Sequence, residues 1–385
     1  MKRLGLVTGE ASGDLIVRDA LVALRAHMPD LALEGVGGPQ LAALGMDCWA
    51  RSEQLAVRGY VEVLQRLPAL LRLRKALTQR WVSQPPHLFL GVDAPDFNLA
   101  LEARLRARGI PTAHLVSPSI WAWRPERLAA IAAAVDHMLC LFPHEPALYA
   151  PTRVRAHYVG HPLADLVPCS LNPLSARHQL GLPESDVRPV LVLMPGSRQA
   201  ELSRLGPIFF QTALRFSRSH QILLPVPSQA ARLQLEGLPG YAALRDLGMR
   251  IVGPLSPDPA RPASHLALEA ADLALIASGT ATLEAALYQV PQVVAYQVPW
   301  LTERLMRRKA IVSRVSLPNL LLKQDWVPEL LQQSCEPNAL EQALRAWEED
   351  PVRRRDYREV TLGLLDQLRR NAAQQVALVL QECLT

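Results

Sequence analysis

The stretch Leu191-Val192-Leu193-Met194-Pro195-Gly196-Ser197-Arg198 is an apolar run of strand length that stops at a turn and an arginine. A second apolar run, Leu273–Ala277, ends in Ser278-Gly279-Thr280 and is followed by a helical pattern over 281–287. Helix N-termini attract phosphate because their N–H groups are unpaired and carry partial positive charge. The guanidinium of Arg198 matches phosphate oxygens in shape and charge. The two segments therefore predict an α/β sheet that holds a phosphorylated ligand at its strand ends.

Strand-like runs alternate with helical patterns along the whole chain, as in parallel sheets covered by helices on both faces. The predicted strands are 4–8, 33–36, 87–92, 112–116, 137–142, 157–159, 190–194, 222–225, 250–252, 273–277 and 293–296. The 385 residues exceed what one hydrophobic core usually supports. We therefore predict two doubly wound, Rossmann-like α/β domains, residues 1–165 and 166–365, connected through the proline-containing segment 162–188.

Ligands of doubly wound sheets bind outside the carboxyl ends of the strands, so we expect the two domains to face an interdomain cleft. Residues 366–385 are helical in composition. This last helix either packs back on the first domain or swaps to another subunit, and both alternatives stay open.

Composition limits the functions that the chain can have. The formal net charge of +5 is too weak a bias to indicate nucleic acid as a partner. The five cysteines are far apart and form no CxxC pair, which favours free thiols in a reducing cytosol. No apolar run approaches the roughly 18 residues of a membrane-spanning helix, and residues 4–7 are too short for a signal peptide. We therefore expect a cytoplasmic protein that is at most peripheral to a membrane.

Common cofactor and metal motifs are absent from the sequence. Gly35-Val36-Gly37-Gly38 lacks the third glycine of the dinucleotide fingerprint, and no glycine-rich loop is followed by a P-loop lysine. There is no DxD pair for a metal–diphosphate and no GxSxG or HExxH motif. We therefore expect no cofactor and no metal, so that Arg198 and helix N–H groups would neutralise a diphosphate leaving group.

The end of the predicted strand 87–92 carries a candidate general base. Asp93 is a carboxylate at the tip of an apolar run, from which side chains enter a cleft. Partial desolvation there would raise its basicity, as general-base catalysis requires. The structural alternative is a turn aspartate that hydrogen-bonds its own backbone. Asp96, just before a helix, is interpreted as an N-cap.

Other loops of the first half add polar and aromatic candidates. In the turn after the first strand, Ser12 fits a helix start, whereas Glu10 is a carboxylate that capping does not require. Trp121, in the loop that begins at Ser117, either fills the core or lines a pocket for a sugar or acyl chain. His161, which precedes a proline, has either a structural or a functional role.

Two residues of the second half complete the polar candidates. Glu284 is not explained as a capping-box partner, because the position three residues earlier is Ala281 and not serine or threonine. A carboxylate one turn into this helix could hold ribose hydroxyls. Asn319 offers an amide that both donates and accepts hydrogen bonds.

Residues 57–81 combine apolar side chains near helical spacing with many basic residues. One interpretation is a core-facing helix pair broken at Pro68. The other is a basic amphipathic stretch that meets a membrane interface or a lipid substrate. The apolar positions are Val61, Val63, Leu64, Leu67, Leu70 and Leu71.

Six short segments, taken in order, resemble those of one bacterial glycosyltransferase family, the lipid-A-disaccharide synthases. They are Gly9-Glu10-Ala11-Ser12-Gly13-Asp14, Asp93-Ala94-Pro95-Asp96-Phe97, Ser117-Pro118-Ser119 with Trp121-Ala122-Trp123, Pro195-Gly196-Ser197-Arg198, Ala277-Ser278-Gly279-Thr280 and Ser316-Leu317-Pro318-Asn319. Each is modest alone, but their order and spacing span nearly the whole chain. The resemblance implies a GT-B fold and transfer of 2,3-diacylglucosamine from its UDP derivative to 2,3-diacylglucosamine 1-phosphate. The products would be UDP and the β-1,6-linked lipid A disaccharide 1-phosphate.

The resemblance also implies roles for the candidates. The second domain would bind UDP, and the first would face the acceptor and the membrane. Asp93 matches the family's proposed base, and Arg198 its diphosphate-contacting arginine. Glu284 and Asn319 match residues of its nucleotide site. Glu10 is a further catalytic candidate, and the remaining substrate-binding candidates are Ser12, Ser117, Trp121, His161, Ser197, Ser278, Gly279 and Thr280.

The apolar positions from Val61 to Leu71 match the family's membrane-docking patch, and Gln297 stands where many relatives would have a basic residue. We expect an inverting, metal-independent enzyme of lipid A biosynthesis on the cytoplasmic face of the inner membrane. Its partners would be the donor, the acceptor and the membrane surface, with a homodimer left open.

Two other interpretations stay open. Another GT-B enzyme, such as a UDP-sugar epimerase or a transferase for a soluble acceptor, would not need the basic apolar surface. A non-catalytic, membrane-docked nucleotide-sugar-binding protein would bind UDP without turnover.

Overall fold

The computed structural model describes residues 1–9, 11–55, 60–122, 124–253, 262–298 and 314–385, and side chains within these ranges except those of 11, 12, 15, 53 and 60–65. The chain divides into two compact units. The first unit contains residues 1–165 and 367–385, and the second contains residues 166–366.

The first unit is built on a seven-stranded sheet in the order β3-β2-β1-β4-β5-β6-β7, in which all neighbours are parallel. The order reverses between β1 and β4, and this switch point is where ligands of such sheets bind. Its strands are β1 (Arg3–Thr8), β2 (Ala32–Gly37), β3 (Asp47–Arg51), β4 (Leu88–Val92), β5 (Thr112–Leu115), β6 (His137–Cys140) and β7 (Arg155–Tyr158). Its helices are α1 (Ala11–His27), α2 (Pro39–Ala43), α3 (Tyr60–Ser83), α4 (Pro95–Arg106), α5 (Leu128–Ala134), α6 (Pro146–Tyr149), α7 (Pro162–Asp165) and α18 (Ala372–Leu384).

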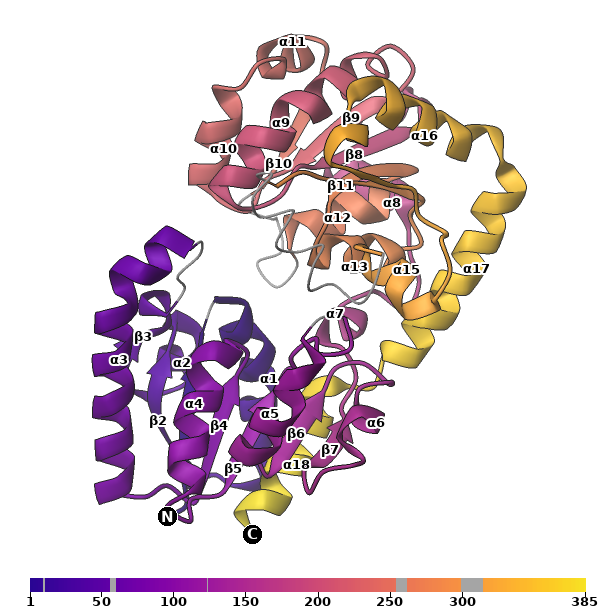
Figure 1. Ribbon diagram of the computed structural model, residues 1–385. Helices are drawn as coiled ribbons and strands as arrows, with labels where there is room; N and C mark the ends of the chain where they lie inside the picture. The colour runs from indigo at the N-terminus through magenta and orange to yellow at the C-terminus, as the bar shows by residue number, and fades with distance from the viewer. Residues whose placement is uncertain (10, 56–59, 123, 254–261, 299–313) are drawn as a thin grey trace. The chain divides into compact units, whose positions relative to one another are not determined.

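Helices cover both faces of this sheet (Figure 1). On β4, Leu88, Leu90 and Val92 pack in one core cluster with α1 and α18. Phe89 points to the opposite face and packs with α3 and α4. Because both faces are covered, the central strands are continuous apolar runs, which is why they could be recognised in the sequence.

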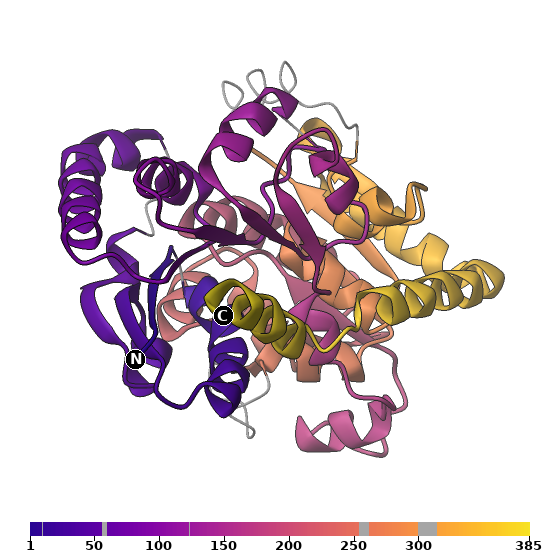
Figure 2. The same cartoon turned by 90° about the horizontal axis from the view of Figure 1, so that it is seen from below.

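The helix α18 follows the whole second unit in sequence but belongs to the core of the first. Its Val376 and Leu380 lie in the same cluster as Leu21 of α1, and the two helices lie side by side (Figure 2). The carboxylate of Asp165 accepts a hydrogen bond of 2.6 Å from the backbone N–H of Ala372. A carboxylate at this end stabilises the helix because it satisfies an unpaired N–H and faces the positive end of the helix dipole.

The helix α3 runs without interruption through Pro68, so the chain does not form a helix pair broken at this residue. A proline inside a helix leaves one carbonyl unpaired, but Pro68 is exposed and water can reach that side of the helix. None of the helices in the described ranges has the length and apolar character required to cross a membrane.

The second unit has a six-stranded sheet in the order β10-β9-β8-β11-β12-β13, again with all neighbours parallel. The order reverses between β8 and β11, which end in the two loops first recognised in the sequence. Its strands are β8 (Val190–Met194), β9 (Gln221–Pro225), β10 (Arg250–Val252), β11 (Leu273–Ala277), β12 (Gln292–Tyr296) and β13 (Glu329–Leu331). Its helices are α8 (Pro173–Gln179), α9 (Gln199–Leu214), α10 (Gln229–Glu236), α11 (Tyr241–Asp246), α12 (Ala263–Ala270), α13 (Thr280–Leu287), α15 (Leu317–Leu322), α16 (Pro337–Glu349) and α17 (Pro351–Leu368).

The segment predicted as a connection, 162–188, is partly built into the second unit. Within it, α8 packs against α12, and the guanidinium of Arg177 donates to the carboxylate of Asp272 at 2.5 Å. Asp272 also accepts a 2.7 Å hydrogen bond from the backbone N–H of Val190, the first residue of β8. The start of the central strand is therefore fixed by a residue of this segment.

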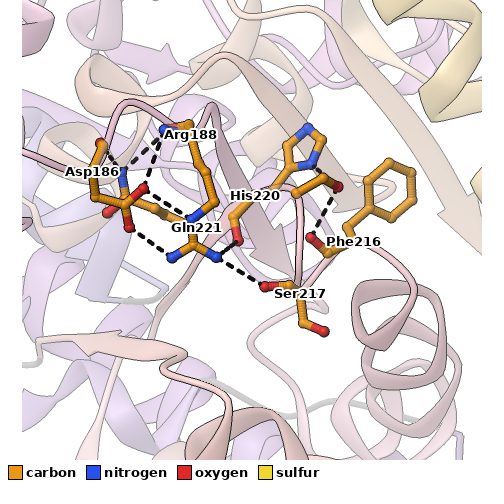
Figure 3. Close-up of polar contacts among 7 residues, drawn as sticks. Asp186, Arg188, Phe216, Ser217, His220 and Gln221 are labelled. Carbon is orange, nitrogen blue, oxygen red and sulfur yellow. Dashed lines mark hydrogen bonds and ion pairs between the residues drawn. The ribbon is translucent and has the colours of Figure 1, made fainter.

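A polar cluster joins the segments that lead into β8 and β9 (Figure 3). Arg188 donates to both oxygens of Asp186, at 2.9 and 2.6 Å, and to the backbone carbonyl of Ser217 at 3.0 Å. The side-chain amide of Gln221 donates to the carbonyl oxygens of Asp186 and Arg188, at 3.0 and 3.2 Å. These bonds hold the amino ends of neighbouring strands in register, at the edge of the sheet opposite to the ligand-binding edge.

Candidate active site

A cavity of about 490 Å³ lies at the carboxyl ends of β8, β9 and β11 in the second unit. Its walls include the turn after β8 and the first turns of α12 and α13. Six candidates from the sequence line this one cavity: Ser197, Arg198, Ser278, Gly279, Thr280 and Glu284. A cavity of this size falls in the range of small-ligand sites, and helix starts favour an anionic ligand.

The turn that carries Arg198 is held by Glu201 in the first turn of α9. Glu201 Oε2 accepts the backbone N–H groups of Ser197 and Arg198, both at 3.3 Å. Its Oε1 accepts a 2.9 Å hydrogen bond from Arg198 Nη1. Gly196 has φ +112°, and a Cβ there would lie 2.6 Å from Glu201 Oε2, so this turn requires glycine. Sequence reasoning missed Glu201, although a glutamate three residues after a helix cap is a recognisable signal.

The start of α13 also lines the cavity. Gly279 precedes the helix with φ +152°, a conformation that residues with a side chain rarely adopt. Ser278 Oγ donates to the carbonyl of Val315 at 3.0 Å, and Thr282 Oγ1 donates to the carbonyl of Gly279 at 2.8 Å. These bonds fix the loop at the start of the helix, where the first N–H groups of a helix point along its axis.

Glu284 lies at the cavity wall with 16% of its side chain exposed. Burial raises the pKa of this carboxyl, and a hydrogen bond with Ser264 opposes the rise. Its Oε2 is 3.7 Å from Nε2 of His265, a buried histidine that packs against the ring of Tyr288. Sequence reasoning did not single out His265, because nothing near it in the chain reveals that it faces a carboxylate.

Asn319 does not line the cavity. It is buried, and both N–H bonds of its amide are used inside the protein, toward the carbonyl of Val327 at 2.8 Å and Glu329 Oε1 at 2.9 Å. Its Oδ1 accepts the N–H of Val327 at 2.9 Å. The same carboxylate of Glu329 accepts from the hydroxyl of Ser316 at 2.6 Å. In this conformation Asn319 orders the segment that leads into β13.

Gln297, which stands where a basic residue was expected, is also engaged in the protein. Its Nε2 donates to the carbonyl oxygens of Gln332 and Cys335, both at 3.0 Å. Arg204 Nη1 lies 3.4 Å from the carbonyl of Gln297 and donates to it. A positive charge from α9 is therefore present next to this position.

In the first unit, Asp93 occupies a strained turn at the switch point of the sheet. Its N–H continues the strand pairing by donating to the carbonyl of Leu115 at 2.9 Å. Asp93 and Ala94 have φ values of +52° and +44°, the left-handed region that favours glycine. A Cβ on Gly9 would lie 2.2 Å from that of Ala94, so the turns after β1 and β4 are in close contact. Strained turns of this kind cluster at functional sites.

Several candidates fall outside the described residues or side chains. Glu10 is one of them, and nothing is described of the side chain of Ser12. Nothing is described either of the side chains at three of the apolar positions of α3, namely Val61, Val63 and Leu64.

Ser117 and Trp121 lie beyond the carboxyl end of β5. The hydroxyls of Ser117 and Tyr149 share a buried hydrogen bond of 2.8 Å. The half-buried ring of Trp121 packs edge-on against His144, with centroids 4.8 Å apart, and against Phe142 at 6.5 Å. The loop after β6 therefore supports the tryptophan on one side.

His161 is buried, and burial lowers its pKa to about 4. Its Nδ1 accepts the N–H of Leu163 at 3.2 Å, which requires a neutral ring. Glu145, in the loop after β6, is also buried and accepts the N–H of Phe142 at 3.0 Å. Burial raises the pKa of Glu145 to about 7. The sequence did not point to Glu145, whose carboxylate closes the turn that carries Phe142 and His144.

The described part of α3 has one face on the core and one in solvent. Leu70 is partly buried against the core cluster that contains Trp81. Leu67 and Leu71 are 40% and 44% exposed. Of the six apolar candidates, these two are large hydrophobic side chains open to solvent in the described range.

The family model described as lipid-A-disaccharide synthetase matches residues 4–380 of the chain. The chain belongs to the lipid-A-disaccharide synthetase family. The lipid-A-disaccharide synthase of Chromobacterium violaceum is 43% identical over 379 residues, which cover 97% of this chain and 95% of that protein. The family named from six short segments of sequence is thereby confirmed.

Solved structures show the same fold at low identity. A glycotransferase of kitacinnamycin superposes with a TM-score of 0.63 at 14% identity and covers 100% of this chain and 99% of its own. The UDP-GlcNAc 2-epimerase of Neisseria meningitidis, solved with UDP-GlcNAc, superposes with a TM-score of 0.58 at 11% identity. The superposition covers 100% of this chain and 99% of the epimerase chain. The predicted α/β class with two parallel-sheet, Rossmann-like domains of the GT-B kind is confirmed.

In this member of the lipid-A-disaccharide synthetase family, five of the six recognised segments lie at or just beyond the carboxyl end of a strand, namely β1, β4, β5, β8 or β11. The sixth, 316–319, begins α15. The residues that resemble the family are thus concentrated where parallel α/β sheets bind ligands.

Proposed function

We propose that the chain is an inverting, metal-independent glycosyltransferase of lipid A biosynthesis. It condenses UDP-2,3-diacylglucosamine with 2,3-diacylglucosamine 1-phosphate and releases lipid A disaccharide 1-phosphate and UDP. The observation that carries this proposal is the family match over residues 4–380, which includes the loops at the strand ends of both units.

The second unit, the UDP-sugar-binding domain, takes the donor in the cavity beside β8 and β11. Arg198 and Ser197 contact the diphosphate together with the loop Ser278-Gly279-Thr280, whose helix start favours the negative charge. Glu284 accepts hydrogen bonds from the ribose hydroxyls. Asn319 acts indirectly by ordering the loop before β13.

The first unit, the acceptor domain, supplies the base. The carboxylate of Asp93 takes the proton of the acceptor's 6-hydroxyl while that oxygen bonds to the anomeric carbon of the donor. The bond from this carbon to UDP breaks at the same time, and its electron pair leaves with UDP. Attack from the side opposite to UDP inverts the configuration, and Arg198 stabilises the charge on the departing diphosphate. Glu10, Ser12, Ser117, Trp121 and His161 hold the acceptor sugar.

The acyl chains place this chemistry at a membrane surface. Leu67 and Leu71 on α3 insert into the interface, flanked by arginines of the same helix. The protein is therefore proposed to lie peripherally on the cytoplasmic face of the inner membrane.

The test is release of UDP from acylated and non-acylated donors, with and without acceptor. Asp93→Ala and Arg198→Ala should each lower turnover by at least ~100-fold, with unfolding temperatures near that of the parent chain. The matched controls are Asp96→Ala, in the first turn of α4 with an 85% exposed side chain, and Arg245→Ala, with a 62% exposed side chain. Both controls should keep normal turnover.

Each competing interpretation predicts a different result. Equal rates with non-acylated substrates would indicate a transferase for a soluble acceptor. Conversion of the donor to an isomer without acceptor would indicate an epimerase. UDP binding without any turnover would indicate a non-catalytic binding protein, in which Asp93 has no role as a base.

A further inference from the structure

A buried polar network joins α4 to the sheet next to Asp93, and the proposed reaction does not use it. Asn98 and Glu102 lie one turn apart on α4, and His114 lies on β5. All three side chains are fully buried. A helix face turned toward a sheet is normally apolar, because polar groups lose hydration when they are buried. Such a network is weak evidence for stability, so it calls for another role.

Asn98 connects this network to the turn of the proposed base. Its Nδ2 donates to the backbone carbonyl of Asp93 at 2.8 Å. The same amide nitrogen lies 3.4 Å from the carbonyl of Val92 and 3.3 Å from that of Val7. One side chain thus holds the last residues of β4, the neighbouring β1 and the residue that carries the carboxylate.

The turn needs such support because its backbone is strained. A left-handed conformation is unfavourable for most residues with a side chain, and the consecutive residues Asp93 and Ala94 both adopt it. The N–H of Asn98 also donates to the carbonyl of Ala94 at 3.0 Å. If the amide were absent, the carbonyl of Asp93 would lose its donor and the turn could relax. A relaxed turn would redirect the carboxylate.

The pair of Glu102 and His114 fixes the distance between α4 and the sheet. Glu102 Oε1 lies 2.8 Å from His114 Nδ1. Gly91 on β4 makes room for the pair, since a Cβ there would lie 2.1 Å from Glu102 Oε1 and 3.0 Å from His114 Nδ1. The same Cβ would lie 3.0 Å from that of Asn98. The helix that carries Asn98 is therefore anchored one turn further along.

We propose that Asn98 is a positioning residue for the transfer reaction: its amide holds Asp93 in the turn conformation from which the carboxylate takes the acceptor's proton. This inference rests on the proposed function, because it requires Asp93 to be the base. In this role Asn98 touches neither substrate and acts on the reaction through Asp93.

Replacement of Asn98 by alanine in the full-length chain tests this role. Asn98→Ala should lower kcat by at least about tenfold, because a small displacement of a catalytic group is enough for such a loss. The KM for the donor and the affinity for UDP, which concern the second unit, should stay within about threefold of the parent values. Thr361→Val is the matched control: this buried hydroxyl donates to the carbonyl of Tyr357 at 2.8 Å in α17. It should lower the unfolding temperature but leave kcat per folded molecule unchanged.

A second substitution separates positioning from folding. Ala94→Gly relieves left-handed strain, so in the Asn98→Ala background it should restore part of the lost kcat. Asn98→Ser keeps one donor and should give an intermediate kcat, and it replaces the alanine variant if that protein does not fold. A folded Asn98→Ala protein with kcat within about twofold of the parent would overturn the proposal.

The result also distinguishes this proposal from the proposed function. If Asp93→Ala is inactive and Asn98→Ala is normal, only the positioning role fails. If Asp93→Ala itself keeps normal turnover, the base assignment fails and the role of Asn98 falls with it.

Discussion

Arg198 Nη1 lies 2.9 Å from Glu201 Oε1, and the other oxygen of this carboxylate accepts the N–H of Arg198 itself. The arginine side chain is 54% exposed, so the pair contributes little to stability. Its effect is on orientation: the carboxylate holds both the turn and the guanidinium at the cavity wall. A diphosphate that binds there meets an arginine that is already in place.

Glu201→Ala should weaken UDP binding, because the turn loses its cap and the guanidinium loses its anchor. We expect the Kd for UDP to rise about tenfold by calorimetry, the loss of one charge-assisted hydrogen bond. The effects of Glu201→Ala and Arg198→Ala should not add in the double variant, because both act on one contact. Glu236→Ala, which removes a similar helix-surface pair with Arg232, is the control. Fully additive effects would show that Glu201 does not act through Arg198.

Glu145→Gln should remove a pH dependence of stability from the first unit. The folded pKa of about 7 lies above the usual value of 4.5, so the folded protein binds the proton more tightly than the unfolded chain. Stability associated with this group is therefore fully present below about pH 4.5 and lost as the pH rises through 7. The glutamine variant should be more stable than the parent by roughly 1–3 kcal/mol at pH 8 and about equal at pH 4.5. Thermal unfolding at the two pH values measures this, and an equal difference at both would contradict it.

Leu67→Ser combined with Leu71→Ser should weaken binding to vesicles that contain anionic lipid. The two side chains are exposed and would bury apolar area in the interface, so affinity should fall by about tenfold or more. Co-sedimentation with vesicles provides the measurement. Leu174→Ser, at a 77% exposed leucine of α8, is the control for general loss of surface hydrophobicity. Equal losses for the control and the double variant would argue against docking through α3.

Arg188→Ala should destabilise the second unit without changing turnover per folded molecule. The hydrogen bond from Arg188 lowers the pKa of Asp186, so the pair contributes stability above about pH 4 and loses it as the pH falls further. The difference in unfolding temperature between parent and variant should therefore shrink on acidification. A turnover loss in folded Arg188→Ala protein would mean that this cluster reaches the active site.

The sequence predicted the sheets well where strands are buried on both faces. β8 and β11 are continuous apolar runs, and the structure pairs them in the centre of their sheet. β3 and β13 were not predicted. Both are edge strands without a fully buried residue, and their apolar runs, Cys48-Trp49-Ala50 and Leu330-Leu331, are too short to distinguish a strand from other structure.

Many of the candidate residues recognised in the sequence, such as Asp93, Ser197 and Ser278, share one property, which is a position just after a strand. Their partners do not have it. Glu201, His265 and Asn98 lie inside helices, where a polar residue is usually interpreted as solvent-facing. Which carboxylate, carbonyl or turn they meet depends on the packing of helix on sheet, and no local pattern records it. The sequence therefore indicated the edge of each sheet at which the candidate residues gather, but not how their side chains are held.

The helix α18 is synthesised after the whole second unit, yet Val376, Leu380 and Leu384 belong to the core that β1 begins. On the ribosome, the first unit therefore emerges with part of one face of its sheet and one side of α1 uncovered, and it stays so while some two hundred further residues are translated. Exposed apolar surface of this kind recruits chaperones and favours aggregation. A chain released before α18 is translated would therefore contain a first unit whose hydrophobic core is incomplete.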